Sequence, residues 1–349
     1  MLTITTMSII FENSKACFIS HKKYIDSLYN NIDCKHSFQL KEGLFEILTP
    51  YKHARNILTS VSNSLDNQLE LDANYVKETY EKFSIELMKH NILHNSDSQI
   101  KSNKFAQNMA DQVYYETTKH KNTNFFGANP DTTTVKEINA TKYLFPKNCQ
   151  FYAFDILDIE KHLSGKKYDL ILLDPPWWNK YIRRKRKKCD FAYQMMYNED
   201  LKKIPVNKLL KDNGLIVVWC TNSPQHLNSL INDVFKKWNV EFVTKWFWLK
   251  VTKFGEPICG FSKPPGKQPF EQIIIAGKTK WKEEDRNKVI VSCPSAIHSH
   301  KPPLVEVLKK YLPENAECLE LFARYLLPNW TSYGNEVIKL QHESLFDVT

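Results

Sequence analysis

The stretch from residue 168 to residue 177 joins an apolar run to a rigid turn, and it reads Tyr168-Asp169-Leu170-Ile171-Leu172-Leu173-Asp174-Pro175-Pro176-Trp177. Its first six residues have the length and the apolar character of a buried strand. The two prolines end that strand, because each fixes φ and lacks a backbone N–H. We therefore expect a core strand that holds Asp174 and Trp177 together at its carboxyl end.

Other apolar runs of strand length lie on both sides of this stretch, at residues 150–154, 215–220, 240–249, 271–276, 288–292, 318–322 and 336–340. Helix-like segments separate several of them, at residues 198–211, 224–238 and 303–312. This alternation predicts an α/β fold, in which a Rossmann-like, mostly parallel sheet is flanked by helices and has an antiparallel portion between residues 240 and 292. In such sheets, ligands bind beyond the carboxyl ends of the strands.

The first part of the chain has a different composition. Its clearest periodic segment runs from residue 74 to residue 93, where apolar side chains recur at the three- and four-residue steps of a helix. Around residues 122–134 the composition shifts to Asn, Thr, Gly and Pro, which favour turns. We predict a smaller, mainly helical N-terminal accessory domain over residues 1–134 and a second domain over residues 135–349.

The composition argues against several classes of protein. The apolar runs are much shorter than the roughly 18 residues of a membrane span, so we expect no membrane association. The eight cysteines include no CxxC pair, which argues against a zinc site or a disulfide framework. His298 and His300 have no third and fourth ligand beside them, so we expect no metal. No secretory leader is evident, and we expect a nuclear protein, with the cytoplasm as a second location.

Positive charge is concentrated at one place in the sequence. The chain carries a formal net charge of +9, and its densest basic run includes Arg183, Arg184 and Lys185, a few residues after Trp177. Such a run fits a loop that grips a nucleic-acid backbone. A solvated loop and a nuclear-import sequence are the alternatives.

The residues that end the strand at 173 suit one difficult reaction. The exocyclic nitrogen of adenine is a poor nucleophile, because its lone pair is delocalised into the ring. Two acceptors aimed at the two amino hydrogens would make that lone pair available, and Asp174 and the Pro175 carbonyl supply them. Pro176 keeps the turn rigid, and Trp177 can stack on the purine. The alternative is a plain strand-ending turn with a buried tryptophan.

Three further segments carry a resemblance to a known family, namely His298-Ser-His-Lys-Pro-Pro303, Leu319-Glu-Leu-Phe-Ala-Arg324 and Pro328-Asn-Trp-Thr-Ser-Tyr-Gly-Asn-Glu336. Together with Asp-Pro-Pro-Trp, in this order and spacing, they resemble the MT-A (70 kDa subunit) family of adenosine methyltransferases, and within it the methyltransferase-like protein 4 branch. The resemblance covers about residues 145–345. It implies a Rossmann-like methyltransferase domain that uses S-adenosyl-L-methionine and no metal.

The resemblance also implies roles for individual residues. Asp155 and Ile156 match contacts to the adenine of the cofactor, and Asp174 matches a contact to its methionine amino group. The positions that match contacts to the ribose and methionine portions are Lys301, Phe322, Arg324, Asn335 and Glu336. Trp219, Trp248 and Glu271 match the pocket of the substrate base. For these three, core packing and a surface strand end are the alternatives.

The resemblance further implies a substrate, for which three hypotheses remain open. The first is N6-methylation of adenosine in RNA, with 2′-O-methyladenosine of U2 small nuclear RNA as the target and an RNA-binding role for the N-terminal domain. The second is N6-methylation of adenine in DNA. The third is a catalytically silent RNA-binding subunit, which the presence of Asp174 and Trp177 argues against. No partner-binding helix is evident, so we expect the chain to act without an obligate partner subunit.

Overall fold

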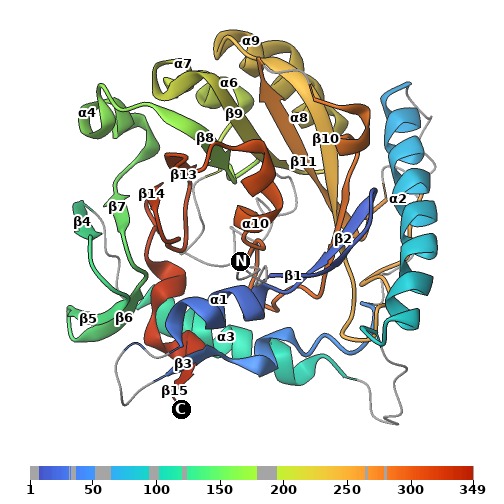
Figure 1. Cartoon of the computed structure of the whole chain (residues 1–349), viewed down its shortest axis with the longest axis horizontal. Helices are drawn as coiled ribbons and strands as arrows, with labels where there is room; N and C mark the ends of the chain where they lie inside the picture. The colour runs from blue at the N-terminus through green and yellow to red at the C-terminus, as the bar shows by residue number, and fades with distance from the viewer. Residues whose placement is uncertain are drawn as a thin grey trace.

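A single large sheet organises the computed structural model of the chain (Figure 1). The structure describes residues 8–30, 32, 37–51, 64–93, 102–119, 124–178, 195–263, 266–278 and 281–348. The sheet has eleven strands in the spatial order β1 (Ile9–Glu12), β2 (Ala16–Ile19), β12 (Val289–Ser292), β10 (Glu241–Lys250), β11 (Phe270–Gly277), β9 (Leu210–Cys220), β8 (Tyr168–Leu173), β13 (Cys318–Leu321), β14 (Trp330–Tyr333), β7 (Cys149–Ala153) and β4 (Phe125–Asn129).

The strands β9, β8, β13, β14 and β7 form a continuous parallel block. β11 runs antiparallel to both of its neighbours, β9 and β10, which confirms the antiparallel portion expected between residues 240 and 292. β12 returns to a parallel pairing with β10. The α/β fold with a mostly parallel sheet is therefore as the sequence predicts.

Two small sheets and a set of helices complete the fold. β3 (Phe38–Leu40) pairs with β15 (Phe346–Val348), and β5 (Thr134–Ile138) pairs with β6 (Thr141–Phe145). The helices are α1 (His21–Tyr29), α2 (Ser64–Lys89), α3 (Lys104–Thr118), α4 (Ile159–Leu163), α6 (Asn198–Leu201), α7 (Val206–Leu209), α8 (Pro224–Ser229), α9 (Phe235–Lys237) and α10 (Val305–Leu308). Among the described residues, none of these helices is both long and apolar enough to cross a membrane.

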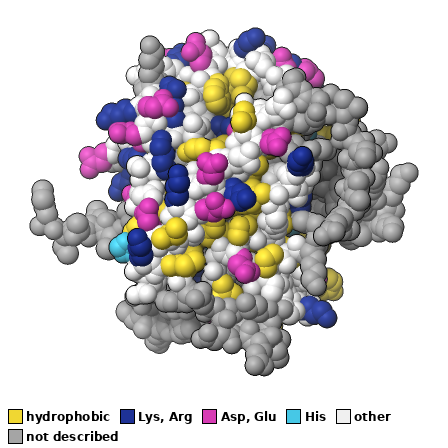
Figure 2. Space-filling model, turned by 90° about the vertical axis from the view of Figure 1, so that its right-hand side faces the viewer, with side chains coloured by type: hydrophobic (Ala, Val, Ile, Leu, Met, Phe, Trp, Pro, Cys, Tyr) yellow, Lys and Arg dark blue, Asp and Glu magenta, His cyan; other side chains and the backbone are white. Residues whose placement is uncertain are grey.

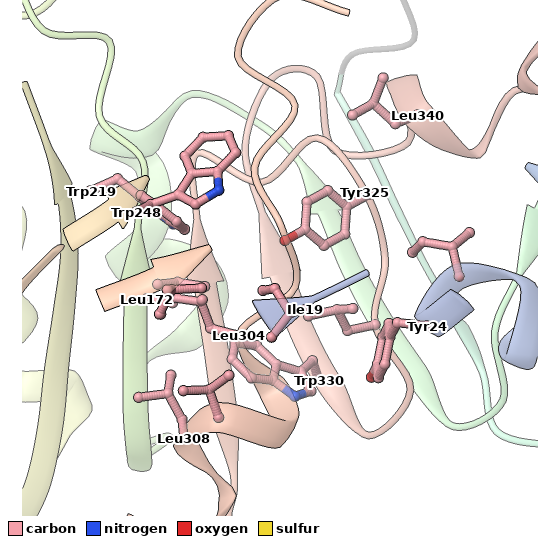
Figure 3. Packing of buried hydrophobic residues seen from close by; sticks show 14 of the residues in the cluster. Ile19, Tyr24, Leu172, Trp219, Trp248, Leu304, Leu308, Tyr325, Trp330 and Leu340 are labelled. Atoms are coloured by element: carbon pink, nitrogen blue, oxygen red, sulfur yellow. The ribbon is translucent and has the colours of Figure 1, made fainter. Parts of the chain in front are cut away.

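The alternation of side chains along β8 separates two cores. Leu170 and Leu172 pack in one cluster with Trp219 and Trp248, whereas Ile171 and Leu173 pack in another cluster on the opposite face. Figure 3 shows part of the first cluster, in which Leu172, Trp219 and Trp248 lie near Leu304 of the segment before α10. Because both faces are covered, the strand is apolar from Leu170 to Leu173, as expected for a parallel sheet.

α2 covers a third cluster, beside the end of the sheet that β1 and β2 form (Figure 1). Val76, Tyr80, Phe83 and Leu87 of this helix are buried against β10 and β12, which confirms the helix expected from residue 74 onward. The helix begins ten residues earlier than the periodicity indicates. Its outer face exposes Leu71, Ile85 and Met88, and Figure 2 views the molecule from this side.

Two predicted elements differ from the structure. The strand expected at residues 336–340 is wrong: the last strand of the parallel block is β14, at Trp330–Tyr333, and Lys339–Gln341 is a short 3-10 helix. Val337 and Ile338 are apolar because they pack in a small cluster that includes Leu326, not because they belong to a strand. The helix expected at residues 198–211 is also interrupted, because Pro205 separates α6 from α7 and residues 210–211 begin β9.

Segments from the N-terminal part of the chain extend the large sheet. β2 pairs in parallel with β12, and β4 pairs antiparallel with β7. The sheet therefore continues across the boundary that the sequence predicts at residue 134. The role of residues 1–134 as an accessory or RNA-binding domain stays a prediction.

One buried amide ties the two parts of the chain together. Gln341 is 2% exposed; its Nε2 donates to the hydroxyl of Tyr29 at 2.6 Å, and its Oε1 accepts from the backbone N–H of Leu326 at 3.0 Å. Tyr29 ends α1 and packs against Phe346 of β15. The amide thus connects α1 to the C-terminal loops through groups that water does not reach.

We expect Gln341→Leu to lower the free energy of unfolding by about 2–4 kcal/mol, because it leaves the Leu326 N–H and the Tyr29 hydroxyl buried without their partner. Urea denaturation followed by circular dichroism measures this change. Gln112→Leu, on the exposed side of α3, is the matched control and should change stability by less than about 0.5 kcal/mol. Equal stability of the two variants would contradict the assigned role of Gln341.

Candidate active site

The predicted cofactor residues follow four neighbouring parallel strands. Asp155 comes after β7, Asn335 after β14, Phe322 after β13 and Asp174 after β8, and these strands are adjacent in the sheet. Since parallel strands share their carboxyl edge, the structure brings the four segments to one side of the molecule. Three strand spacings of about 4.8 Å place the outer two strands about 14 Å apart. A site at this edge suits an elongated ligand whose two ends differ in chemistry.

Asp174 lies between two cations. One carboxylate oxygen is 3.5 Å from Nζ of Lys301, and the other is 3.2 Å from the guanidinium of Arg324. The hydroxyl of Ser299 donates to the second oxygen at 3.4 Å. The side chain of Asp174 is 13% exposed, so this carboxylate is held in place and remains accessible on one side. The structure thus brings together three residues that the sequence predicted separately.

The ion pairs continue beyond Lys301. Its Nζ lies 2.7 Å from Glu271, whose other oxygen pairs with Lys250. Burial alone would raise the pKa of Glu271, but Lys250 and Lys301 together outweigh burial and hold that pKa well below its usual range. Burial would likewise lower the pKa of Lys301, but Asp174 and Glu271 outweigh it and raise that pKa. Lys250, Glu271, Lys301, Asp174 and Arg324 form a row of alternating charges, which we call the charge chain.

Two tryptophans line the charge chain. Trp219 and Trp248 are each 2% exposed, and their rings meet edge to face at 5.5 Å (Figure 3). Lys301 lies over the ring of Trp219 at 5.5 Å, and Lys250 lies over that of Trp248 at 4.5 Å. Both tryptophans belong to the core, as the alternative interpretation holds, and they also lie directly beside Glu271 and its partners.

The turn after β8 is more tightly bonded than the sequence suggests. The Pro175 carbonyl is expected to be free, but it accepts from the backbone N–H of Trp177 at 2.8 Å. A carbonyl oxygen has two lone pairs, so one acceptor position remains. The indole of Trp177 is 8% exposed; its N–H donates to the Trp219 carbonyl at 2.7 Å, and its ring lies 5.1 Å from that of His226. The turn is therefore anchored to both β9 and α8.

Glu320 belongs to the site, although it is not among the residues that the sequence predicts for it. It lies on β13 and is 5% exposed, and its Oε2 has no hydrogen-bond partner among the described residues. Burial, reinforced by the nearby Asp174 carboxylate and opposed by Arg324, raises the pKa of Glu320 to about 8. A carboxyl group on an otherwise apolar core strand is the sequence feature by which it could have been found.

The remaining predicted residues fit a cofactor with an adenosyl end and an amino-acid end. Asp155 is exposed next to the buried Ile156, and it caps the following turn by accepting from the Leu157 N–H at 2.9 Å. At the other end, the cations of the charge chain suit a carboxylate, and Asp174 suits an ammonium group. Gly334 permits the close approach of these loops, because a Cβ there would lie 3.1 Å from the backbone of Phe322.

Some predicted residues take other positions or fall outside the structure. Glu336 forms an ion pair with Lys339 at 2.6 Å, so its carboxylate already has a partner. Arg183, Arg184 and Lys185 lie outside the described residues. Within the described ranges, no group of three or more His, Cys, Asp or Glu side chains is arranged to hold a metal ion.

Comparisons with known proteins identify this part of the chain. Residues 168–336 match the MT-A70 family model. The chain is 39% identical over 232 residues to the human N(6)-adenine-specific methyltransferase METTL4, and the aligned region covers 62% of this chain and 48% of that protein. It is 37% identical over 217 residues to the Caenorhabditis elegans DNA N6-methyl methyltransferase, covering 61% of this chain and 58% of that one.

A third relative bears a different name. The N6-methyladenosine RNA methyltransferase MTA1 of Cryphonectria parasitica is 38% identical over 215 residues, covering 59% of this chain and 63% of that protein. The chain spans about half the length of the mammalian relatives that it matches. The matched region of the family model contains Asp174, Glu271, Lys301 and Arg324.

The buried Glu320 predicts a pH dependence of stability. Its pKa is raised on folding, so the stability that the protonated carboxyl contributes is present below about pH 4.5 and is lost as the pH rises through about 8. Glu320→Gln keeps a neutral side chain at every pH. We expect the free energy of unfolding of the variant, relative to that of the unchanged protein, to increase by on the order of 2–4 kcal/mol as the pH rises from 5 to 9. Urea denaturation at each pH measures this difference.

Glu314→Gln is the control for this experiment, because Glu314 is exposed. Its unfolding curves should shift with pH in parallel with those of the unchanged protein. A pH-independent difference between Glu320→Gln and the unchanged protein would show that Glu320 is ionised in the folded state.

Proposed function

Since the chain belongs to the MT-A70 family, we propose that it transfers a methyl group from S-adenosyl-L-methionine to the exocyclic amino group of an adenine in nucleic acid. The observation that carries this proposal is the placement of Asp174, which is held by Lys301 and Arg324 at the carboxyl end of β8, beside Glu271. The sequence similarity to proteins named as N6-adenine and N6-methyladenosine methyltransferases supports it.

The chemistry follows from the acceptors at the turn. When bound, the cofactor supplies an activated methyl group on its positive sulfur. Asp174 and the second lone pair of the Pro175 carbonyl accept hydrogen bonds from the adenine amino group and make its lone pair available. Pro176 fixes the direction of that carbonyl. Trp177, whose indole N–H is fixed by the Trp219 carbonyl, stacks on the purine with its exposed part.

The cofactor is held across the four parallel strand ends. Asp155 and Ile156 bind the adenosyl end, and Phe322 and Asn335 contact its middle. Lys301 and Arg324 face the methionine carboxylate. Glu336 reaches the ribose if it exchanges Lys339 for a ribose hydroxyl. Trp219, Trp248 and Glu271 form the floor of the pocket for the substrate base.

We propose RNA as the substrate, with 2′-O-methyladenosine in U2 small nuclear RNA as the specific target and the nucleus as the place of action. The basic run that includes Arg183, Arg184 and Lys185 suits a phosphate backbone, and the chain acts on a base that is unpaired or flipped out. DNA is the second candidate substrate, which the similarity to the DNA N6-methyl methyltransferase of Caenorhabditis elegans favours.

The two candidate substrates are distinguished by tritium transfer from labelled cofactor to oligonucleotides of identical sequence. We expect more label in single-stranded RNA than in DNA, and most in RNA whose target adenosine carries a 2′-O-methyl group. Nuclease digestion and chromatography identify the methylated nucleoside. Greater turnover on DNA would reverse the assignment of the substrate, and incorporation at another atom would overturn the assignment of the reaction.

We expect Asp174→Asn to lower kcat by roughly 100- to 1,000-fold, because an amide presents a donor where the adenine amino group needs an acceptor. The rate is measured by the same tritium assay, and circular dichroism checks that the fold is retained. Asp212→Asn is the matched control, because Asp212 is exposed near the start of β9, far along the strand from its carboxyl end. A rate for Asp174→Asn equal to that of the control would refute the role of Asp174.

A further inference from the structure

A second pocket lies on the opposite face of the sheet from the charge chain. It has a volume of about 190 Å³ and lies between α2 on one side and α8 with the following π-helix Leu230–Val234 on the other. Its floor is formed by Asn222, just after β9, and by Gln272 of β11. The volume is below the roughly 300–1,000 Å³ of pockets that enclose a whole drug-sized molecule, so it suits a single ring system.

The lining of this pocket is rich in amides and poor in charge. Five amide side chains contribute to it, namely Gln68, Asn222, Asn228, Asn232 and Gln272, and the apolar side chains of Leu69, Leu227 and Ile231 complete its walls. Amides offer donors and acceptors side by side, which is how asparagine and glutamine bind the edges of nucleobases. The apolar walls suit the faces of a flat ring.

The charges around the pocket argue against an anionic ligand. Asp72 is the charged residue of the lining, and its carboxylate pairs with Lys245 and accepts from Gln68 at 3.1 Å. Among the described residues that line the pocket, none is a lysine or an arginine. Among the described side chains that Figure 2 shows on this side, basic and acidic groups are mixed. The lining therefore suits a neutral heterocycle better than a phosphate.

Gln272 supplies an independent indication of a ligand. It is 2% exposed, its Nε2 donates to Asn222 at 3.2 Å, and its Oε1 has no hydrogen-bond partner in the part of the chain that the structure describes. The amide of Asn222 in turn donates to the Phe270 carbonyl at 2.6 Å. A buried acceptor without a donor costs about 1–3 kcal/mol, and a ring N–H or an amino group in the pocket would satisfy it after a small rotation of the amide.

The pocket is linked to the candidate active site through shared elements. α8 forms one wall, and His226 of this helix bonds to the Trp178 carbonyl at 2.9 Å and lies beside the ring of Trp177. β9 leads into Asn222, and the backbone carbonyl of Trp219 in this strand accepts the hydrogen bond from the indole N–H of Trp177. The pocket and the Asp-Pro-Pro-Trp turn therefore lie at the same edge of the sheet, near the ends of the neighbouring strands β8 and β9.

We propose that this pocket binds an unpaired nucleobase that flanks the target adenosine, with Gln272 and Asn222 reading its edge. The proposal rests on the proposed function, because it assumes a polynucleotide substrate. The pocket gives the protein a preference for the sequence around its target, and it holds the strand on the far side of the sheet from the charge chain.

The test uses the full chain and fluorescently labelled single-stranded RNA with one central adenosine, in which each neighbouring base is replaced in turn by an abasic residue. Fluorescence anisotropy gives the Kd. We expect one abasic position to weaken binding roughly 5- to 100-fold, the equivalent of one good base contact. Gln272→Leu should weaken binding of the intact RNA by a similar factor and should be insensitive to the abasic replacement at that position.

A second variant guards against misfolding of the buried one. Asn228→Phe fills the pocket from its exposed rim on α8 and should behave like Gln272→Leu, whereas Gln225→Phe, on the exposed side of the same helix, should bind like the unchanged protein. The proposal is overturned if no abasic position changes the Kd, or if no RNA binds. It is also overturned if each variant, compared with the unchanged protein, weakens binding of the intact RNA and of the abasic RNA by the same factor.

The tritium assay on the same oligonucleotides separates the two proposals. Base-dependent binding without methyl transfer would support the pocket and overturn the proposed function. Methyl transfer without dependence on any flanking base would support the function and overturn the pocket.

Discussion

The candidate site depends on keeping five charges of alternating sign at a largely buried strand edge. Glu271 lies between Lys250 and Lys301, and Asp174 lies between Lys301 and Arg324. Removing Glu271 from such a row leaves Lys250 largely buried without its carboxylate partner, which costs several kcal/mol. The row therefore fixes the positions of loops that are far apart in sequence. A charged ligand can enter only by exchanging with one of these partners or by adding to the row at its end.

The protonation of Glu320 sets the net charge of this edge. With Glu320 neutral, the charge chain holds three cations and two carboxylates, an excess of one positive charge. Ionised Glu320 would cancel that excess and would repel Asp174. Burial and Asp174 raise its pKa to about 8, which keeps the carboxyl protonated at neutral pH. The excess cation remains available to a ligand carboxylate, such as that of the methionine portion of the proposed cofactor.

The sequence predicts what is local and misses what depends on distant pairing. The strand at 168–173 and the turn at Asp174 were predictable, because an apolar run and two prolines act on their own neighbours. The pairing of β2 with β12 was not, because its register depends on residues about 270 positions away. The strand β14 was predicted too late in the sequence, at residues 336–340, because Val337 and Ile338 are apolar. These two side chains are apolar because they pack in a buried cluster outside the strand. The environment of Glu320 was hidden for the same reason, since its burial comes from other segments of the chain.

The two-residue period of β11 explains how one strand serves two different environments. Glu271 and Gln272 are neighbours in sequence, yet their side chains leave the sheet on opposite faces. Glu271 joins the charge chain, whereas Gln272 forms the floor of an amide-lined pocket. Antiparallel pairing with both β9 and β10 fixes this register, since Gln272 pairs with Cys220 and Glu271 pairs with Trp248. A shift of one residue would bury the carboxylate among amides, and it would remove the carboxylate partner of Lys250 and one of the two partners of Lys301. The electrostatics of the charge chain and the register of the sheet therefore stabilise each other.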